Sequence, residues 1–161
     1  MRKYNSLDKA LIIYVRYIVV AFVQSSPNRN KEGIIIIMDK LLDLTRDFDA
    51  AKAAFEAYLD EYDRADDKIH LKIVHTYGVV DAAEDIARRM GLGEEDVQLA
   101  KVIGLLHDIG RFEQIKRFDS FEPGTMEHAA YGAQILFGPE KMIRRFVKDD
   151  RFDSLICTAI E

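Results

Sequence analysis

The pair His107-Asp108 closes the apolar run 102–106 and joins two side chains that can bind a metal ion. A neutral imidazole and a carboxylate both coordinate divalent cations, and the negative end of a helix dipole favours a cation at the same place. The pair therefore indicates a metal-binding site, and its alternative is a helix C-terminal cap with local hydrogen bonds.

Two more of the four histidines lie on apolar faces of predicted helices. A single histidine in such a place is more often a buried core residue than a ligand. Beside the His107-Asp108 pair, metal ligation becomes the better interpretation of His75. For His128 the sequence leaves three roles open, which are ligation of a second metal, contact with the substrate phosphate, or the start of a helix.

Arg111 directly follows Gly110 and is a candidate catalytic residue. A planar guanidinium suits two-point contact with a phosphate, although an ordinary surface arginine is the alternative. The segment after it, up to residue 126, is predicted to be a loop at the mouth of the site. Its basic residues stand among phenylalanines, whose rings could stack a base. The segment could therefore hold a nucleotide, but more often such a pattern marks an amphipathic segment whose aromatic residues enter the core.

The elements that must position these residues are all predicted to be helices. Residues 68–90 carry His75 in an apolar stripe and end before Gly91. The next helix opens in the acidic turn 94–96 and becomes apolar nearly all round, so it should be the buried central helix, ended by Gly110. Further helices are predicted over about 47–66, over 126–137, from 139 and from 153. The last shows no stop signal before residue 161, so we expect it to continue.

Residues 1–37 differ in character from the rest and are predicted to be an amino-terminal extension of a helical domain spanning 38–161. The apolar run 11–23 is interrupted by Arg16, falls short of the roughly 20 residues of a spanning helix, and has no cleavage site after it. Either Met38 is the true start, or the extension adds a helix and a strand that cover an exposed face. Its apolar residues could also form a homodimer surface.

Composition limits the function classes. The 161 residues suit one soluble domain, and 23 basic against 28 acidic residues give a net charge of -5. Without a long basic run, binding to duplex nucleic acid is disfavoured, and no membrane association is expected. The single cysteine, Cys157, allows neither an internal disulfide nor a cysteine zinc cluster. We expect a cytoplasmic protein.

The order His75, then His107-Asp108 within Gly-Leu-Leu-His-Asp-Ile-Gly, resembles the HD-domain superfamily of metal-dependent phosphohydrolases over about residues 70–161. The resemblance implies an all-α HD-type bundle whose metal ligands are His75, His107 and Asp108, with Asp108 bridging where two ions bind. Residues 127–136 resemble the HD-GYP branch, in which a further histidine, here His128, serves a second metal.

Two departures from the family pattern affect the interpretation. The last family aspartate lies on a helix beyond residue 161, and the glycine-tyrosine-proline signature is missing, which argues against cyclic di-GMP as substrate. Nitrogen and oxygen ligands favour one or two ions of Mn, Fe, Co, Ni, Zn or Mg. We therefore expect an HD-type hydrolase that acts on a small phosphorylated substrate, with a nucleotide as the first choice. Its rival is a non-catalytic HD fold that binds a nucleotide or a protein partner.

Overall fold

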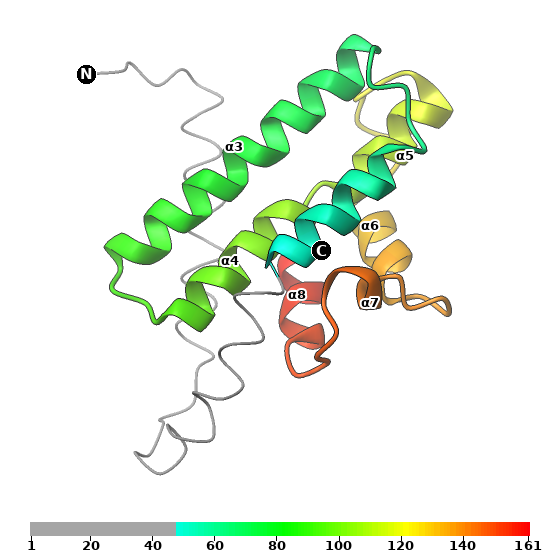
Figure 1. Ribbon diagram of the computed structural model, residues 1–161. Coiled ribbons are helices and arrows are strands. Elements are labelled where there is room, and N and C mark those ends of the chain that lie inside the picture. The colour runs from blue at the N-terminus through cyan, green and yellow to red at the C-terminus, as the bar shows by residue number, and fades with distance from the viewer. Residues whose placement is uncertain (1–47) are drawn as a thin grey trace, which may run out of the picture.

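The computed structural model describes residues 48–161, and within this range the chain is helical with no strand. This confirms the all-α prediction for the described part, whereas the extension 1–37 and its border at Met38 lie outside it. The described part is helical over 48–59 and continues through six further helices (Figure 1), which are α3 (Asp67–Arg89), α4 (Glu94–Leu106), α5 (Ile109–Phe118), α6 (His128–Phe137), α7 (Ile143–Phe146) and α8 (Asp153–Ile160).

Helices α3 and α4 form a long pair that lies side by side in Figure 1. The Asp66 side chain caps α3 by accepting hydrogen bonds from the amides of Lys68 and Ile69 at 2.8 and 2.9 Å. Beyond the other end of α3, Gly91 takes the left-handed conformation with φ +70°. The predicted bounds of α3 are thus confirmed to within one residue, and the close pairing fixes where the α4 C-terminus lies against α3.

Helix α5 corrects the sequence analysis, which predicted a loop after Gly110. The helical path breaks instead at Asp108, whose φ of -109° and ψ of 19° separate α4 from α5. Gly110 lies in the first turn of α5, where a Cβ would overlap the carbonyl oxygen of His128 and approach the Gly132 amide to 2.9 Å. Gly110 is therefore needed for the close approach of α5 and α6, and it does not stop a helix.

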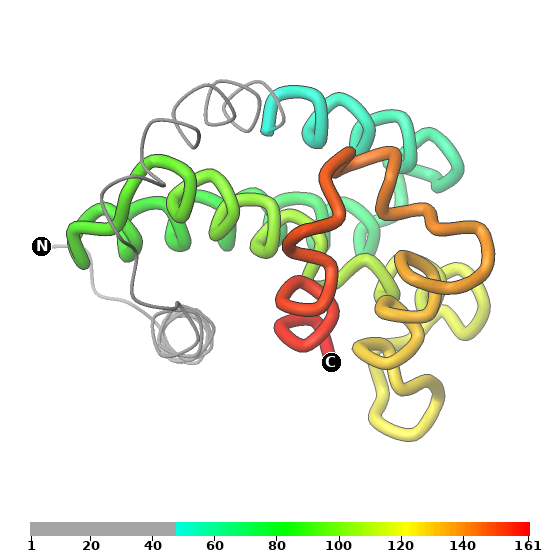
Figure 2. Tube along the Cα trace, turned by 90° about the horizontal axis from the view of Figure 1, so that it is seen from below, coloured from blue at the N-terminus to red at the C-terminus, as the bar shows by residue number. Residues whose placement is uncertain are grey.

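An aromatic cluster fixes α5 against the helical residues 48–59. Phe112 of α5 is fully buried, and its ring centroid lies 5.8 Å from that of Phe55 and 6.1 Å from that of Tyr58. On the other side of the core, α8 contacts both α4 and α6 through buried residues that include Ile156 and Ile160 (Figure 2). Packing on both sides thus holds the junction of α4 and α5 in place.

Among residues 48–161, no helix combines the length and the apolar character that crossing a bilayer would require.

Candidate functional site

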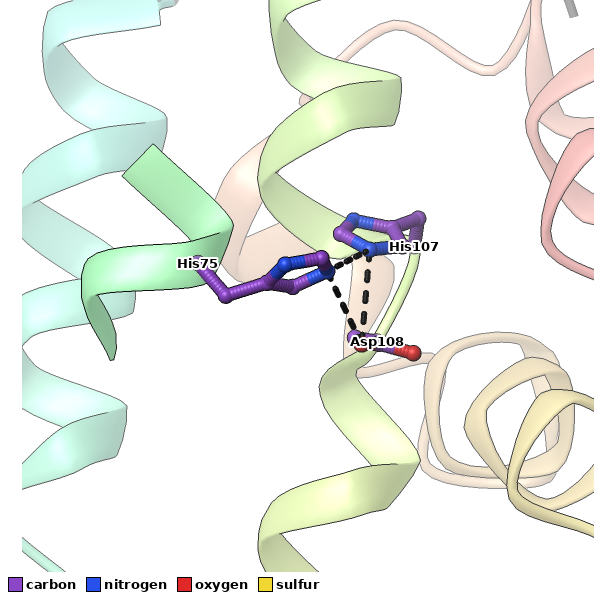
Figure 3. A group of neighbouring side chains, drawn as sticks. All are labelled: His75, His107 and Asp108. Carbon is purple, nitrogen blue, oxygen red and sulfur yellow. Dashed lines mark hydrogen bonds and ion pairs between the residues drawn. The ribbon is translucent and has the colours of Figure 1, made fainter. Parts of the chain in front are cut away.

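Three predicted site residues come together where the junction of α4 and α5 meets α3 (Figure 3). His75 lies on α3, while His107 and Asp108 occupy the junction itself. The Nε2 atoms of the two histidines are 3.3 Å apart, and Asp108 Oδ2 lies 3.5 Å from His75 Nε2 and 3.4 Å from His107 Nε2. The side chains therefore converge on one point.

The three donor atoms fit a divalent cation. Because they form a nearly equilateral triangle, one point lies about 2 Å from all three, which is close to the bond lengths of protein-bound zinc. His107 and Asp108 are both buried, and His75 is partly exposed. An ion held here by protein ligands on one side could keep open positions on the other.

Backbone contacts orient the His107 ring. Its Nδ1 lies 2.8 Å from the carbonyl oxygen of Gly104, and because a carbonyl can only accept, Nδ1–H is the donor. In the neutral ring Nε2 then carries a lone pair, which faces His75 and Asp108. The non-helical dihedral angles at Asp108 let two adjacent residues address the same point. A backbone acceptor behind a ligating histidine is a common support of metal sites.

The protonation states of the cluster favour cation binding. Burial lowers the pKa of His75 to about 4, and the nearby positive charge of Lys72 and the His107 ring act in the same direction. Burial alone would raise the pKa of Asp108, but hydrogen bonding and charge from the protonated form of His107, together with Lys72, hold it well below its usual range. At neutral pH the site therefore offers a neutral imidazole and an ionised carboxylate, the forms that ligate metals.

His128 and Arg111 approach the other carboxylate oxygen of Asp108. His128, the first residue of α6, has its Nε2 3.6 Å from Asp108 Oδ1, and Arg111 Nε on α5 is 3.9 Å from the same oxygen. Burial and the charge of Arg111 lower the pKa of His128. The other four residues predicted from the sequence thus surround the carboxylate of Asp108, but only His75 and His107 form the compact donor triangle with it.

Lys72 belongs to this cluster and was missed by the sequence analysis. Its Nζ lies 2.6 Å from Asp108 Oδ2, and the side chains of both residues are largely buried. The available signal was its spacing, since residues three apart on a helix share a face and His75 follows Lys72 by three.

Gln114 is a second residue that the sequence did not reveal. It is fully buried in α5 and accepts a hydrogen bond from Arg111 Nη1 at 2.6 Å. Its amide donates to Thr125 Oγ1 at 2.7 Å and to the carbonyl oxygen of Glu122 at 3.3 Å. Gln114 therefore ties Arg111 to the segment that joins α5 and α6. The sequence analysis placed Gln114 in a loop, where a polar residue is ordinary, so its polarity did not reveal this role.

The phenylalanines expected at the mouth of the site have different positions. Phe112 is buried in the core, so it cannot stack a base. Phe118 is 47% exposed, and the ring of Phe121 lies with its centroid 5.5 Å from Lys72 Nζ. Of these rings, only that of Phe121 is tied to the cluster around Asp108, through Lys72.

A comparison with known protein families gives a match. The family model described as HD domain matches residues 73–161, more than half of the chain, and this range contains all five predicted site residues. No curated protein and no solved structure matches the chain.

Proposed function

The chain belongs to the HD domain family, and on that premise we propose that it is a metal-dependent phosphohydrolase acting on a small phosphorylated compound. The observation that carries the proposal is the triangle of His75 Nε2, His107 Nε2 and Asp108 Oδ2, with edges of 3.3–3.5 Å. Three donors of suitable type at one point, two of them buried, would bind a divalent ion, which is what this hydrolytic chemistry needs.

His75, His107 and Asp108 would hold the ion. When bound, such an ion supplies an activated water and relieves charge on the phosphoryl group. The protein contributes the geometry: the Gly104 carbonyl fixes the His107 ring, and the break at Asp108 turns the carboxylate towards both histidines. Because these groups are held by packed helices, they require little rearrangement during the reaction.

Arg111 is proposed to contact the substrate phosphate. Gln114 holds one end of the guanidinium, through Nη1. Its Nε is buried 3.9 Å from Asp108 Oδ1 and, within residues 48–161, has no hydrogen-bond partner. A guanidinium held through Nη1 beside the donor triangle suits contact with an anionic oxygen.

His128 is proposed to ligate a second ion that Asp108 would bridge. Support comes from its Nε2, which lies 3.6 Å from Asp108 Oδ1, the oxygen that the donor triangle does not use. Its lowered pKa also favours the neutral, ligating form. The metal content of His128→Ala tests this role, since we expect one ion per chain where the wild type binds two.

A nucleotide is the proposed substrate class among phosphorylated compounds. Support comes from Phe121, whose ring lies beside Lys72 and could stack a base near the proposed phosphate-binding residues. A panel of nucleoside monophosphates and non-nucleotide phosphomonoesters, compared by phosphate release, distinguishes this preference from general phosphatase activity.

The decisive experiment compares His107→Ala with His70→Ala, which replaces an exposed histidine on α3 as a matched control. Bound metal is measured by mass spectrometry, and phosphate release is measured on the same panel. We expect His107→Ala to lose its metal and to fall in activity by about 100-fold or more, and His70→Ala to behave as wild type. Equal metal content and activity in wild type and His107→Ala would exclude the proposal. Metal binding without turnover of any phosphoester would instead favour a binding module.

A further inference from the structure

Lys72 occupies a place that the proposed function does not explain. Its Nζ lies 2.6 Å from Asp108 Oδ2. That oxygen is also the one that lies 3.5 Å from His75 Nε2 and 3.4 Å from His107 Nε2. The ammonium is therefore bound to the same carboxylate oxygen that would ligate the metal.

A divalent ion and this ammonium cannot both sit favourably at one oxygen. An ion within about 2 Å of Oδ2 would come within a few ångströms of Nζ, where like charges in a partly buried site repel strongly. Arg111 adds a third positive group, since its Nε lies 3.9 Å from Asp108 Oδ1. Lys72 is the group that can move, because a flexible four-carbon chain carries its charge.

The surroundings of Lys72 include a second group that can hold the ammonium. The Phe121 ring, with its centroid 5.5 Å from Nζ, lies on the segment between α5 and α6. An ammonium can be held over an aromatic face at such a distance. The side chain of Lys72 is 15% exposed, so it has some access to solvent. An ammonium that left Asp108 for this ring would remain close to the ion that had replaced it.

We propose that Lys72 is an internal counter-ion of Asp108 that a divalent metal displaces, and that the displaced ammonium then binds a phosphate monoester. This inference rests on the proposed function. With the metal bound, the divalent ion, Lys72 and Arg111 exceed the single negative charge of Asp108. A terminal phosphate with two negative charges balances this excess better than a phosphodiester, which carries one. The substrate class is therefore the phosphate monoester.

Metal affinity tests the first half of the inference. The full chain, stripped with chelator, is titrated with Mn²⁺ by calorimetry, and folding is checked by circular dichroism. We expect Lys72→Met to bind Mn²⁺ about tenfold more tightly than wild type, because a competing charge is gone. Lys72→Arg should bind it more weakly, since a guanidinium holds a carboxylate by two bonds. Lys68→Met is the control, because Lys68 lies one turn earlier on α3 and pairs with the exposed Asp119.

Phosphate binding tests the second half. With saturating Mn²⁺, methyl phosphate should bind to Lys72→Met about tenfold more weakly than to wild type and Lys68→Met, and dimethyl phosphate should bind weakly to all three. If Lys72→Met binds Mn²⁺ no more tightly than wild type, the displacement is wrong, although the metal site stands. Unchanged affinity for methyl phosphate would overturn the phosphate role. If wild type and His107→Ala alike bind no Mn²⁺, the proposed function fails and the inference fails with it.

Discussion

The two oxygens of the Asp108 carboxylate face two differently built regions. Oδ2 faces His75, His107 and Lys72, which come from the long α3–α4 pair and its end. Oδ1 faces Arg111 and His128, which lie in the first turns of the short helices α5 and α6. The first region carries the compact donor triangle, and the second carries groups that are held less closely. On the proposals above, the first region would bind the first ion, whereas the second would add the Arg111 contact with phosphate and the second ion at His128.

The two regions also depend on different kinds of support. In the first, the Asp66 side chain caps α3, and a backbone carbonyl orients His107. In the second, α6 begins at His128 without a side-chain cap. The position of α6 depends on its contact with α5 at Gly110 and on the hydrogen bonds of Gln114. Changes to tertiary contacts should therefore disturb the second region more than the first.

The largest effect is expected for Gly110→Ala. The added Cβ would overlap the carbonyl oxygen of His128, a backbone atom that cannot rotate away, so α5 and α6 must separate. We expect a loss of about 3 kcal/mol in the free energy of unfolding, measured with urea. Gly104→Ala is the matched change in the first region, where a Cβ would lie 3.3 Å from Val80 Cα, and it should cost about 1 kcal/mol. Equal costs would contradict the difference between the regions.

The second largest effect is expected for Gln114→Leu, which removes the side chain that hydrogen-bonds both Arg111 and Thr125. Arg111 Nη1 loses its 2.6 Å acceptor and Thr125 Oγ1 loses its 2.7 Å donor, in a place where the glutamine itself is fully buried. We expect a cost of about 2–3 kcal/mol in unfolding free energy. Mn²⁺ affinity should stay near that of wild type, because the donor triangle does not contact Gln114. A strong loss of metal binding in a folded variant would show that the two regions are not separable.

Sequence patterns predicted the first region better than the second. The apolar stripe and the turn at Gly91 located α3, and the His107-Asp108 pair at the end of a buried helix located the donor triangle. These signals are local, since helical period and chain neighbours determine them. The prediction of a loop after Gly110 was wrong because that glycine serves a contact with α6, which no local pattern reveals. Lys72 was missed because its spacing from His75 shows a shared face but not the reach of its side chain.

The pH dependence of stability offers a smaller but directional test. The pKa of His75 is lowered to about 4 from an ordinary value near 6.5, first by burial and then by Lys72 and His107. Between these values the unfolded chain binds a proton that the folded chain does not, so stability falls as the pH falls through this window. Allowing for the partial exposure of His75, we expect it to contribute about 2 kcal/mol to this loss. Asp108 acts in a separate window, below its ordinary value of 3.8.

Urea unfolding in the presence of chelator, at pH 7 and pH 4.5, measures this contribution. His75→Gln should lose less stability between the two pH values than wild type does. His128→Gln is the counterpart in the second region, and it should change the pH dependence less. A larger change for His128→Gln than for His75→Gln would contradict the expectation that the first region contributes more to the pH dependence of stability.

The smallest effect is expected for Gly78→Ala, and it has the opposite sign. Gly78 lies within α3, one turn after His75, and is exposed, with no atom within 4 Å of the position that a Cβ would take. Alanine restricts the unfolded chain and favours the helix, so we expect a gain of about 0.5–1 kcal/mol in unfolding free energy and an unchanged Mn²⁺ affinity. Because Gly110→Ala is expected to act in the other direction, the pair of variants separates close helix contact from the general effect of replacing a glycine. Destabilisation by Gly78→Ala would show that this face of α3 is covered, and a gain in stability with weaker metal binding would show that the backbone near His75 must stay adaptable.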